Sequence, residues 1–182
     1  IVGAGVELWG HRATFLASFP HALRWETLAL VWLTLIAATI CHEFAHGLTC
    51  KHHGGEVHEV GFLMMFFTPC LYCNVSDAWL IPSKWQRLWV TLAGAWCDLC
   101  LWALATMIWR LTVLDSMVNY LGSVVLSVCG ARVLLNFNPL LKLDGYYLLS
   151  DWLEIPNLRG RSWERWLAWV RCLLWGAPRP PP

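Results

Sequence analysis

Charged residues are scarce in this chain. Only 14% of its 182 residues are Asp, Glu, Lys or Arg, whereas a soluble domain usually carries about 25%. Hydrophobic residues make up 58%, and the mean hydropathy is +0.50. This composition argues against an ordinary soluble domain and predicts a membrane protein. The net charge of only +1 gives no reason to expect nucleic acid as a partner.

The chain also lacks an initiator methionine, an evident signal peptide and an internal repeat. We therefore expect one domain that is a piece of a longer protein. Residues 1–26 are expected to be an upstream or interfacial segment, and residues 27–158 a membrane-embedded core. Residues 159–182 are rich in Trp and Arg, which predicts an amphipathic segment or the start of a further span.

Long apolar stretches at residues 27–50, 88–109 and 118–135 each have enough residues to cross a bilayer as a helix. Fourteen tryptophans fit this class, because indole rings favour the membrane–water interface. The apolar stretch at 61–72 is too short to span and contains Pro69. We therefore predict an all-α membrane protein with a three-span helical core and a short re-entrant or β-like segment.

The first apolar stretch contains the sequence H-E-F-A-H at residues 42–46. In a helix, His42 and His46 share one face and can bind one zinc ion, while Glu43 is close enough to activate a zinc-bound water. Glu43 is also the only charged residue between Glu26 and Lys51. Ionisable residues in so apolar a segment indicate a functional site.

Catalytic zinc usually has three protein ligands and an open position, and the residues allow three completions. His52 has the spacing of a third helix-borne histidine, although Thr49 stands where that motif has a glycine. A downstream glutamate, Glu56 or Glu59, is a second possibility. The third is Asp144, which follows the last apolar span and precedes Gly145, whose backbone freedom would let the carboxylate turn inward.

Two motifs in this order resemble the site-2 protease family of intramembrane zinc proteases: the H-E-F-A-H stretch and N-x-x-P-x-x-x-L-D-G at residues 136–145. The resemblance covers about residues 27–158. It implies that His42, His46 and Asp144 bind zinc and that Glu43 is the catalytic base. It further implies that Asn136 holds substrate backbone and that the site lies within the membrane near its cytoplasmic side.

Two further stretches, at residues 68–79 and 142–157, resemble bacterial peptide zinc metalloproteases linked to peptide export and to secretion-adaptor proteins. This implies a multi-pass protein of the bacterial inner membrane. The partners it implies are a peptide or membrane-protein substrate, the lipid bilayer and secretion adaptors.

These observations leave two functions from different classes. The first is an intramembrane zinc metalloendopeptidase that hydrolyses peptide bonds of membrane-associated peptides or proteins, with Glu43 activating the water. The alternative is a non-proteolytic, zinc-containing membrane component of a peptide export or secretion complex. The alternative leaves Glu43 unexplained, because a structural site does not need a carboxylate that is not a ligand.

Asp98 lies inside the second apolar stretch and is costly in lipid, so it should face the bundle. It is expected either to hydrogen-bond a ligand histidine or to pair with Arg132. The C-x-x-C pairs Cys70/Cys73 and Cys97/Cys100 are expected mainly to pack, with a second zinc site or a redox pair as lesser alternatives.

Lys and Arg are unevenly distributed about the expected spans. The loops beside the C-terminal ends of the first and third spans hold Lys51, Lys84, Arg87, Lys142, Arg159, Arg161 and Arg165. The opposite side holds Arg12, Arg24 and Arg110. By the positive-inside rule, the end carrying His42 and His46 is expected to face the cytoplasm.

Overall fold

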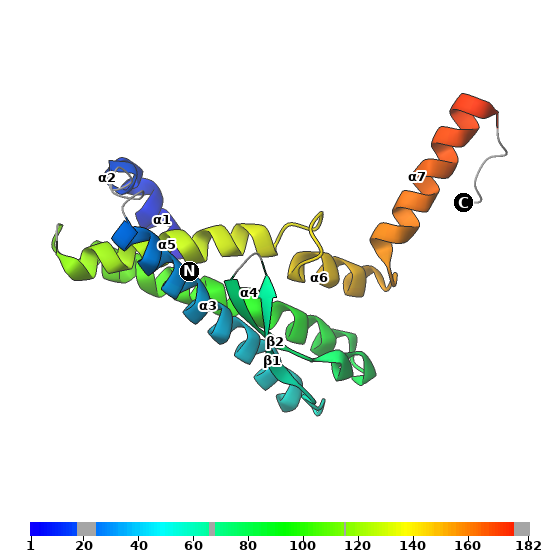
Figure 1. Cartoon of the computed structure of the whole chain (residues 1–182), viewed down its shortest axis with the longest axis horizontal. Coiled ribbons are helices and arrows are strands. Elements are labelled where there is room, and N and C mark those ends of the chain that lie inside the picture. Colours follow the sequence, from blue (N-terminus) through cyan, green and yellow to red (C-terminus); the bar gives the residue numbers. More distant parts are fainter. Residues whose placement is uncertain (18–24, 66–67, 115, 177–182) are drawn as a thin grey trace.

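The computed structural model describes residues 1–17, 25–65, 68–114 and 116–176, and this part is mostly helical (Figure 1). Arg24 and the side chain of Cys70 lie outside the described part. The elements in chain order are α1 (Val2–Gly10), α2 (Arg12–Ala17), α3 (Trp25–His52), β1 (Val60–Met65), β2 (Thr68–Cys73), η2 (Ser76–Leu80), α4 (Lys84–Leu111), α5 (Met117–Asn136), α6 (Asp144–Leu153) and α7 (Leu158–Trp175).

Three helices are long and apolar enough to cross a membrane, which confirms the predicted spans and the membrane-protein class. They are α3 and α4, with 28 residues each, and α5, with 20. At 1.5 Å per residue, even α5 is about 30 Å long, close to the thickness of the hydrocarbon core. All three extend one to four residues beyond the predicted boundaries, because polar residues such as Lys84 and Asn136 still continue the helices.

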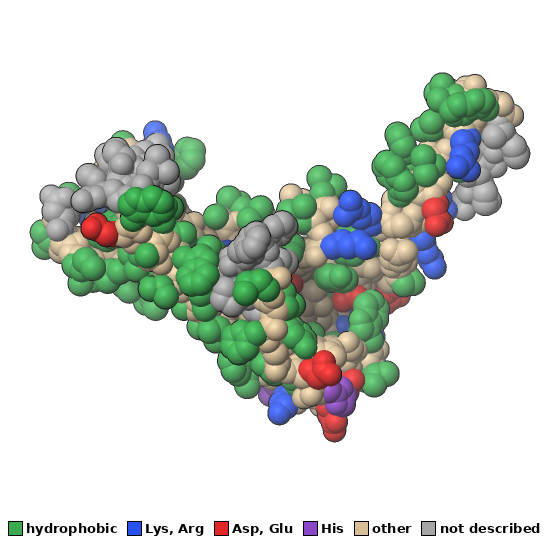
Figure 2. Space-filling model, in the orientation of Figure 1, with side chains coloured by type: hydrophobic (Ala, Val, Ile, Leu, Met, Phe, Trp, Pro, Cys, Tyr) green, Lys and Arg blue, Asp and Glu red, His purple; other side chains and the backbone are tan. Residues whose placement is uncertain are grey.

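Helix α4 packs against both α3 and α5, and α3 also contacts α5. Small residues allow this close approach. A Cβ at Gly122 of α5 would lie 3.2 Å from the backbone nitrogen of Trp109 in α4. Ala105 and Trp109 form a buried cluster with Leu126 at this contact. Hydrophobic side chains cover much of the face drawn in Figure 2, as expected of a surface in contact with lipid.

Strands β1 and β2 form an antiparallel hairpin in which Val60 pairs with Cys73 and Met65 with Thr68. This confirms the prediction of a β-like segment at 61–72. Strand β2 packs on α3, so the hairpin lies beside the helix that carries the two histidines.

Helix α5 ends at Asn136, three residues before Pro139, and α6 begins at Asp144. Gly145 was expected to supply backbone freedom, and this expectation is wrong: it is helical and is not among the glycines with positive φ. It instead permits close packing, because a Cβ there would lie 2.6 Å from the carbonyl oxygen of Asn136. The missing side chain lets the first turn of α6 pack against the end of α5.

Helix α7 extends away from the bundle (Figure 1). Its N-terminal end is joined to α6 by a hydrogen bond from the Arg159 backbone N–H to the Tyr146 hydroxyl (3.1 Å). Helix α7 is not among the described helices that are both long and apolar enough to cross a membrane.

Candidate metal centre

Helix α3 presents two buried histidines one turn apart. His42 is 5% exposed and His46 is 7% exposed, and their Nε2 atoms lie 3.2 Å from each other. The four-residue spacing places both rings on the face that packs against α4.

Asp144, the first residue of α6, brings a carboxylate to the same point. Its Oδ2 lies 3.0 Å from His42 Nε2, and its Oδ1 lies 3.6 Å from His46 Nε2. The three side chains form one of two groups of described residues with potential metal ligands close together. The structure thus joins residues at opposite ends of the core sequence.

The donor atoms fit zinc. Zinc binds nitrogen and oxygen at about 2.0–2.1 Å in a tetrahedron, which places the ligands roughly 3.3 Å apart. The observed separations are 3.2, 3.0 and 3.6 Å. Asp144 Oδ2 is buried and makes no hydrogen bond of normal geometry, despite its distance from His42 Nε2. A buried carboxylate oxygen facing two imidazole nitrogens is the arrangement that a shared cation would stabilise.

Hydrogen-bond acceptors on α4 orient both imidazoles. His42 Nδ1 lies 3.0 Å from Asp98 Oδ2, and His46 Nδ1 lies 2.7 Å from the carbonyl oxygen of Val90. Because a carbonyl can only accept, His46 carries its proton on Nδ1, and the carboxylate favours the same tautomer for His42. Each Nε2 is then left with a lone pair for a metal.

Asp98 makes both of the contacts that the sequence offered as alternatives. It is 0% exposed and also accepts hydrogen bonds from Arg132 Nε (3.3 Å) and Asn136 Nδ2 (3.1 Å). Arg132 supplies the positive charge that a buried carboxylate requires, and its Nη1 donates to Thr39 of α3. Asn136 therefore has a structural contact, in addition to the substrate-binding role that the family resemblance implies.

Sequence reasoning missed Gly94. A Cβ at this position would lie 2.6 Å from His42 Nε2 and would overlap His46 Nε2. Val90, Gly94 and Asp98 are spaced by four residues and so form one stripe of α4. Within this stripe, the Val90 carbonyl accepts a hydrogen bond from His46, Gly94 leaves room for both rings, and Asp98 accepts a hydrogen bond from His42. The spacing of Gly94 and Asp98 was visible in the sequence, but nothing there showed which face of α4 meets α3.

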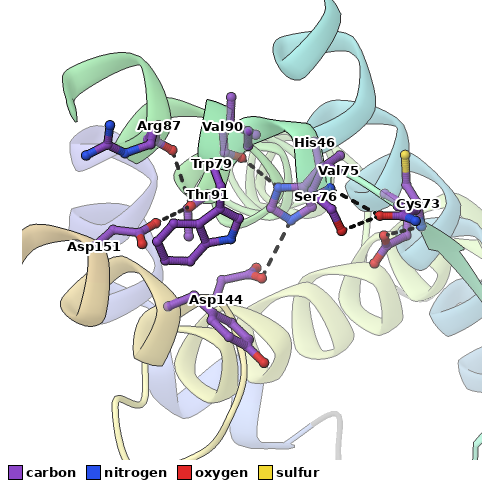
Figure 3. A pocket seen from close by; sticks show the side chains of 14 residues that line it. His46, Cys73, Val75, Ser76, Trp79, Arg87, Val90, Thr91, Asp144 and Asp151 are labelled. Carbon is purple, nitrogen blue, oxygen red and sulfur yellow. Dashed lines mark hydrogen bonds and ion pairs between the residues drawn. The ribbon is translucent and has the colours of Figure 1, made fainter. Parts of the chain in front are cut away.

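Glu43 does not belong to the group of three ligands. Its Oε2 accepts a hydrogen bond from the Cys73 backbone N–H at the end of β2 (3.1 Å). Together with His46 and Asp144, it lines a cavity of about 340 Å³ (Figure 3). The residue expected to act as base therefore lies beside the three potential ligands and lines the same cavity as two of them, His46 and Asp144.

Asp144 is suited to ligation by its charge. Burial by itself raises the pKa of this carboxyl, but positive charge at the facing Nε2 atoms, carried by protons on His42 and His46 when no metal is bound, outweighs burial and lowers the pKa below its usual value. Asp144 is therefore an anion at neutral pH.

The other residues considered as a third ligand lie elsewhere. His52 is exposed and packs against the ring of His53, and Glu59 is exposed. Glu56 belongs to a second potential metal group, on the surface, with His58 and Asp77.

Three of the four cysteines in the two C-x-x-C pairs have described side chains, and none of these three lies in a potential metal group. Cys73, Cys97 and Cys100 are free thiols. Neither of the two potential metal groups among the described residues includes a cysteine.

Comparisons of the chain with protein-family models, with curated proteins and with solved structures found no match.

Proposed function

We propose that this chain is the core of an intramembrane zinc metalloendopeptidase of the site-2 protease type, which hydrolyses peptide bonds of membrane-associated peptides or proteins. One observation carries the proposal: His42, His46 and Asp144 place their donor atoms together, and two of them, His46 and Asp144, line a cavity that Glu43 also lines. A purely structural zinc site would not require the half-buried Glu43 carboxylate beside the ligands.

Zinc, when bound there, would acidify a water molecule and polarise the carbonyl of the scissile bond. Glu43 would accept the proton of the attacking water and transfer it to the departing amine. The Cys73 N–H holds the Glu43 carboxylate in place, while Asp98 and Val90 hold the imidazoles. Glu43 would thus transfer the proton, and Asp98 and Val90 would orient the ligands.

The hairpin favours the proposal that the substrate is a peptide. Strand β2 lies between β1 and α3 in the described contacts, so the outer edge of β1 is free to pair with another strand. Phe62 and Met64 on β1 are 73% and 71% exposed. An extended substrate segment could add to this edge through backbone hydrogen bonds, and Val60 pairs with Cys73 beside Glu43.

Removal of the metal tests the proposal. The purified protein in detergent should cleave membrane-inserted model peptides, lose this activity in a chelator, and regain it when zinc is returned. Product formation and bound zinc are measured together. Stoichiometric zinc without cleavage of any peptide would instead support a non-proteolytic zinc component of an export complex.

The proposal includes an orientation with the zinc end of α3 toward the cytoplasm of a bacterial inner membrane, based on the Lys/Arg distribution. A cysteine at exposed Glu56, in a background without the eight native cysteines, should react with an impermeant thiol reagent only after the cells are opened. A cysteine at Val113, which is 79% exposed beyond the other end of α4, should react in intact cells. The reverse pattern would invert the topology.

A further inference from the structure

The cavity beside the metal centre contains a second buried carboxylate, Asp151 of α6. This residue is only 8% exposed. Its Oδ2 accepts a hydrogen bond from the Thr91 hydroxyl (3.2 Å), but its Oδ1 is buried without a hydrogen-bond partner. Figure 3 shows the carboxylate directed toward Thr91, beside the ring of Trp79. The metal centre does not use this group.

Asp151 also lacks a cation. No ion pair within 4.0 Å joins it to any Lys, Arg or His in the described part of the chain. Arg87 lines the same cavity, but its Nη1 donates to the carbonyl oxygens of Ile81 (3.0 Å) and Pro82 (3.5 Å). Burial raises the pKa of Asp151, and the Thr91 hydrogen bond and the charge of Arg87 offset this only in part. A buried carboxylate of this kind gains the most from a positively charged ligand.

Helix geometry places Asp151 a few substrate residues away from the proposed metal ligands. Asp144, Tyr147 and Asp151 are at positions i, i+3 and i+7 of α6, so they share one face, and all three line the cavity. Seven residues of helix span about 10.5 Å. About three residues of an extended peptide span the same distance. A Lys or Arg that is closer than this to the scissile bond could also reach Asp151, because its side chain is long.

We propose that Asp151, together with the ring of Trp79, forms a subsite for a cationic group of the substrate, an ammonium or guanidinium within about three residues of the scissile bond. This inference rests on the proposed protease function. Trp79 is 60% exposed and lines the cavity, and an indole face attracts cations. Membrane proteins carry Lys and Arg at the cytoplasmic ends of their spans, where the orientation proposed above places this site.

The first experiment measures cleavage of peptide pairs that differ only by Lys or Gln at one position within three residues of the cleaved bond. Each pair is made with a free and with an acetylated N-terminus. The zinc-loaded parent should prefer the cationic peptide by about tenfold or more in kcat/KM. Preference for Lys identifies a side chain as the source of the charge, whereas preference abolished by acetylation identifies the terminal amine.

Asp151→Asn keeps the shape and an acceptor for Thr91 but removes the charge. It should reduce the preference to less than about twofold, while kcat/KM for the neutral peptide and the zinc content stay at the parent level. Glu154→Gln is the matched control just after the same helix, since the Glu154 side chain is 59% exposed and faces Lys84 outside the cavity. An equal loss on cationic and neutral peptides in Asp151→Asn would show a structural role and overturn the proposal.

A binding measurement tests the cation subsite independently of zinc-dependent cleavage. After a chelator has removed the metal, the parent in nanodiscs should still bind a fluorescently labelled Lys peptide more tightly than the matching Gln peptide. Asp151→Asn should bind the two peptides equally. This result would support the subsite even if no zinc-dependent cleavage were found. Equal affinity of the chelated parent for both peptides, together with equal cleavage of both, would refute the subsite and leave the protease function standing.

Discussion

Replacing Glu43 with Gln should reduce cleavage by at least about 100-fold, the lower end of what a positioned general base contributes. The zinc content should remain that of the parent, because Glu43 lies outside the group of three ligands. Gln keeps an oxygen that can accept the Cys73 N–H, so the side chain should hold its position. The measurement is bound zinc per chain beside the rate of peptide cleavage.

Glu59→Gln is a suitable control for the change of charge, because Glu59 is exposed just before β1. This variant should cleave at the parent rate. Loss of zinc together with activity in Glu43→Gln would contradict the role of base and would make Glu43 part of the metal centre.

Asp144→Ala should remove most of the bound zinc. The variant loses the only anionic ligand and leaves two histidines, one protein ligand short of the usual three. The loss of affinity should exceed the roughly 10–100-fold that follows from removing a hydrogen-bond partner of a ligand. Asp144→Asn, which keeps the shape but not the charge, should also bind zinc more weakly. Competition with a chelating dye measures the affinity of each purified variant.

Two controls make this result specific. His52→Ala should keep zinc, because His52 is exposed at the end of α3. Glu56→Gln should keep it as well, and since Glu56 belongs to the surface group it also reports any zinc bound there. Parent-like zinc binding in Asp144→Ala with loss in His52→Ala would establish the helix-borne third histidine and refute the resemblance to site-2 proteases.

The spans and the hairpin could be predicted because each depends on local chemistry. A run of apolar residues longer than a bilayer crossing must be helical in lipid, and twelve apolar residues with Pro69 cannot span. The shared face of His42 and His46 also follows from spacing alone. That Asp144 meets them required the family resemblance, because no local rule joins α3 to α6.

The remainder of the site depends on packing between helices, which the sequence does not specify. The face of α4 that meets α3 makes the Val90 carbonyl a hydrogen-bond acceptor for His46. At position 94 of the same face, a glycine leaves room for the rings that any Cβ would take. Asp98 was expected to choose between His42 and Arg132, but a buried carboxylate has enough lone pairs to accept from both. The role expected of Gly145 was wrong for the same reason, because close contact with α5 decides it.

The separation of the ligands along the chain also sets an order of events during synthesis. The two histidines leave the ribosome with the first span, whereas Asp144 follows only after α4 and α5. A nascent chain thus carries an incomplete set of donors until α5 and the start of α6 have been made, since synthesis proceeds from the N-terminus. Under the proposed function, the chain therefore cannot hydrolyse a neighbouring protein before α6 has been made, and the hydrolytic site matures only once Asp144 has joined the two histidines.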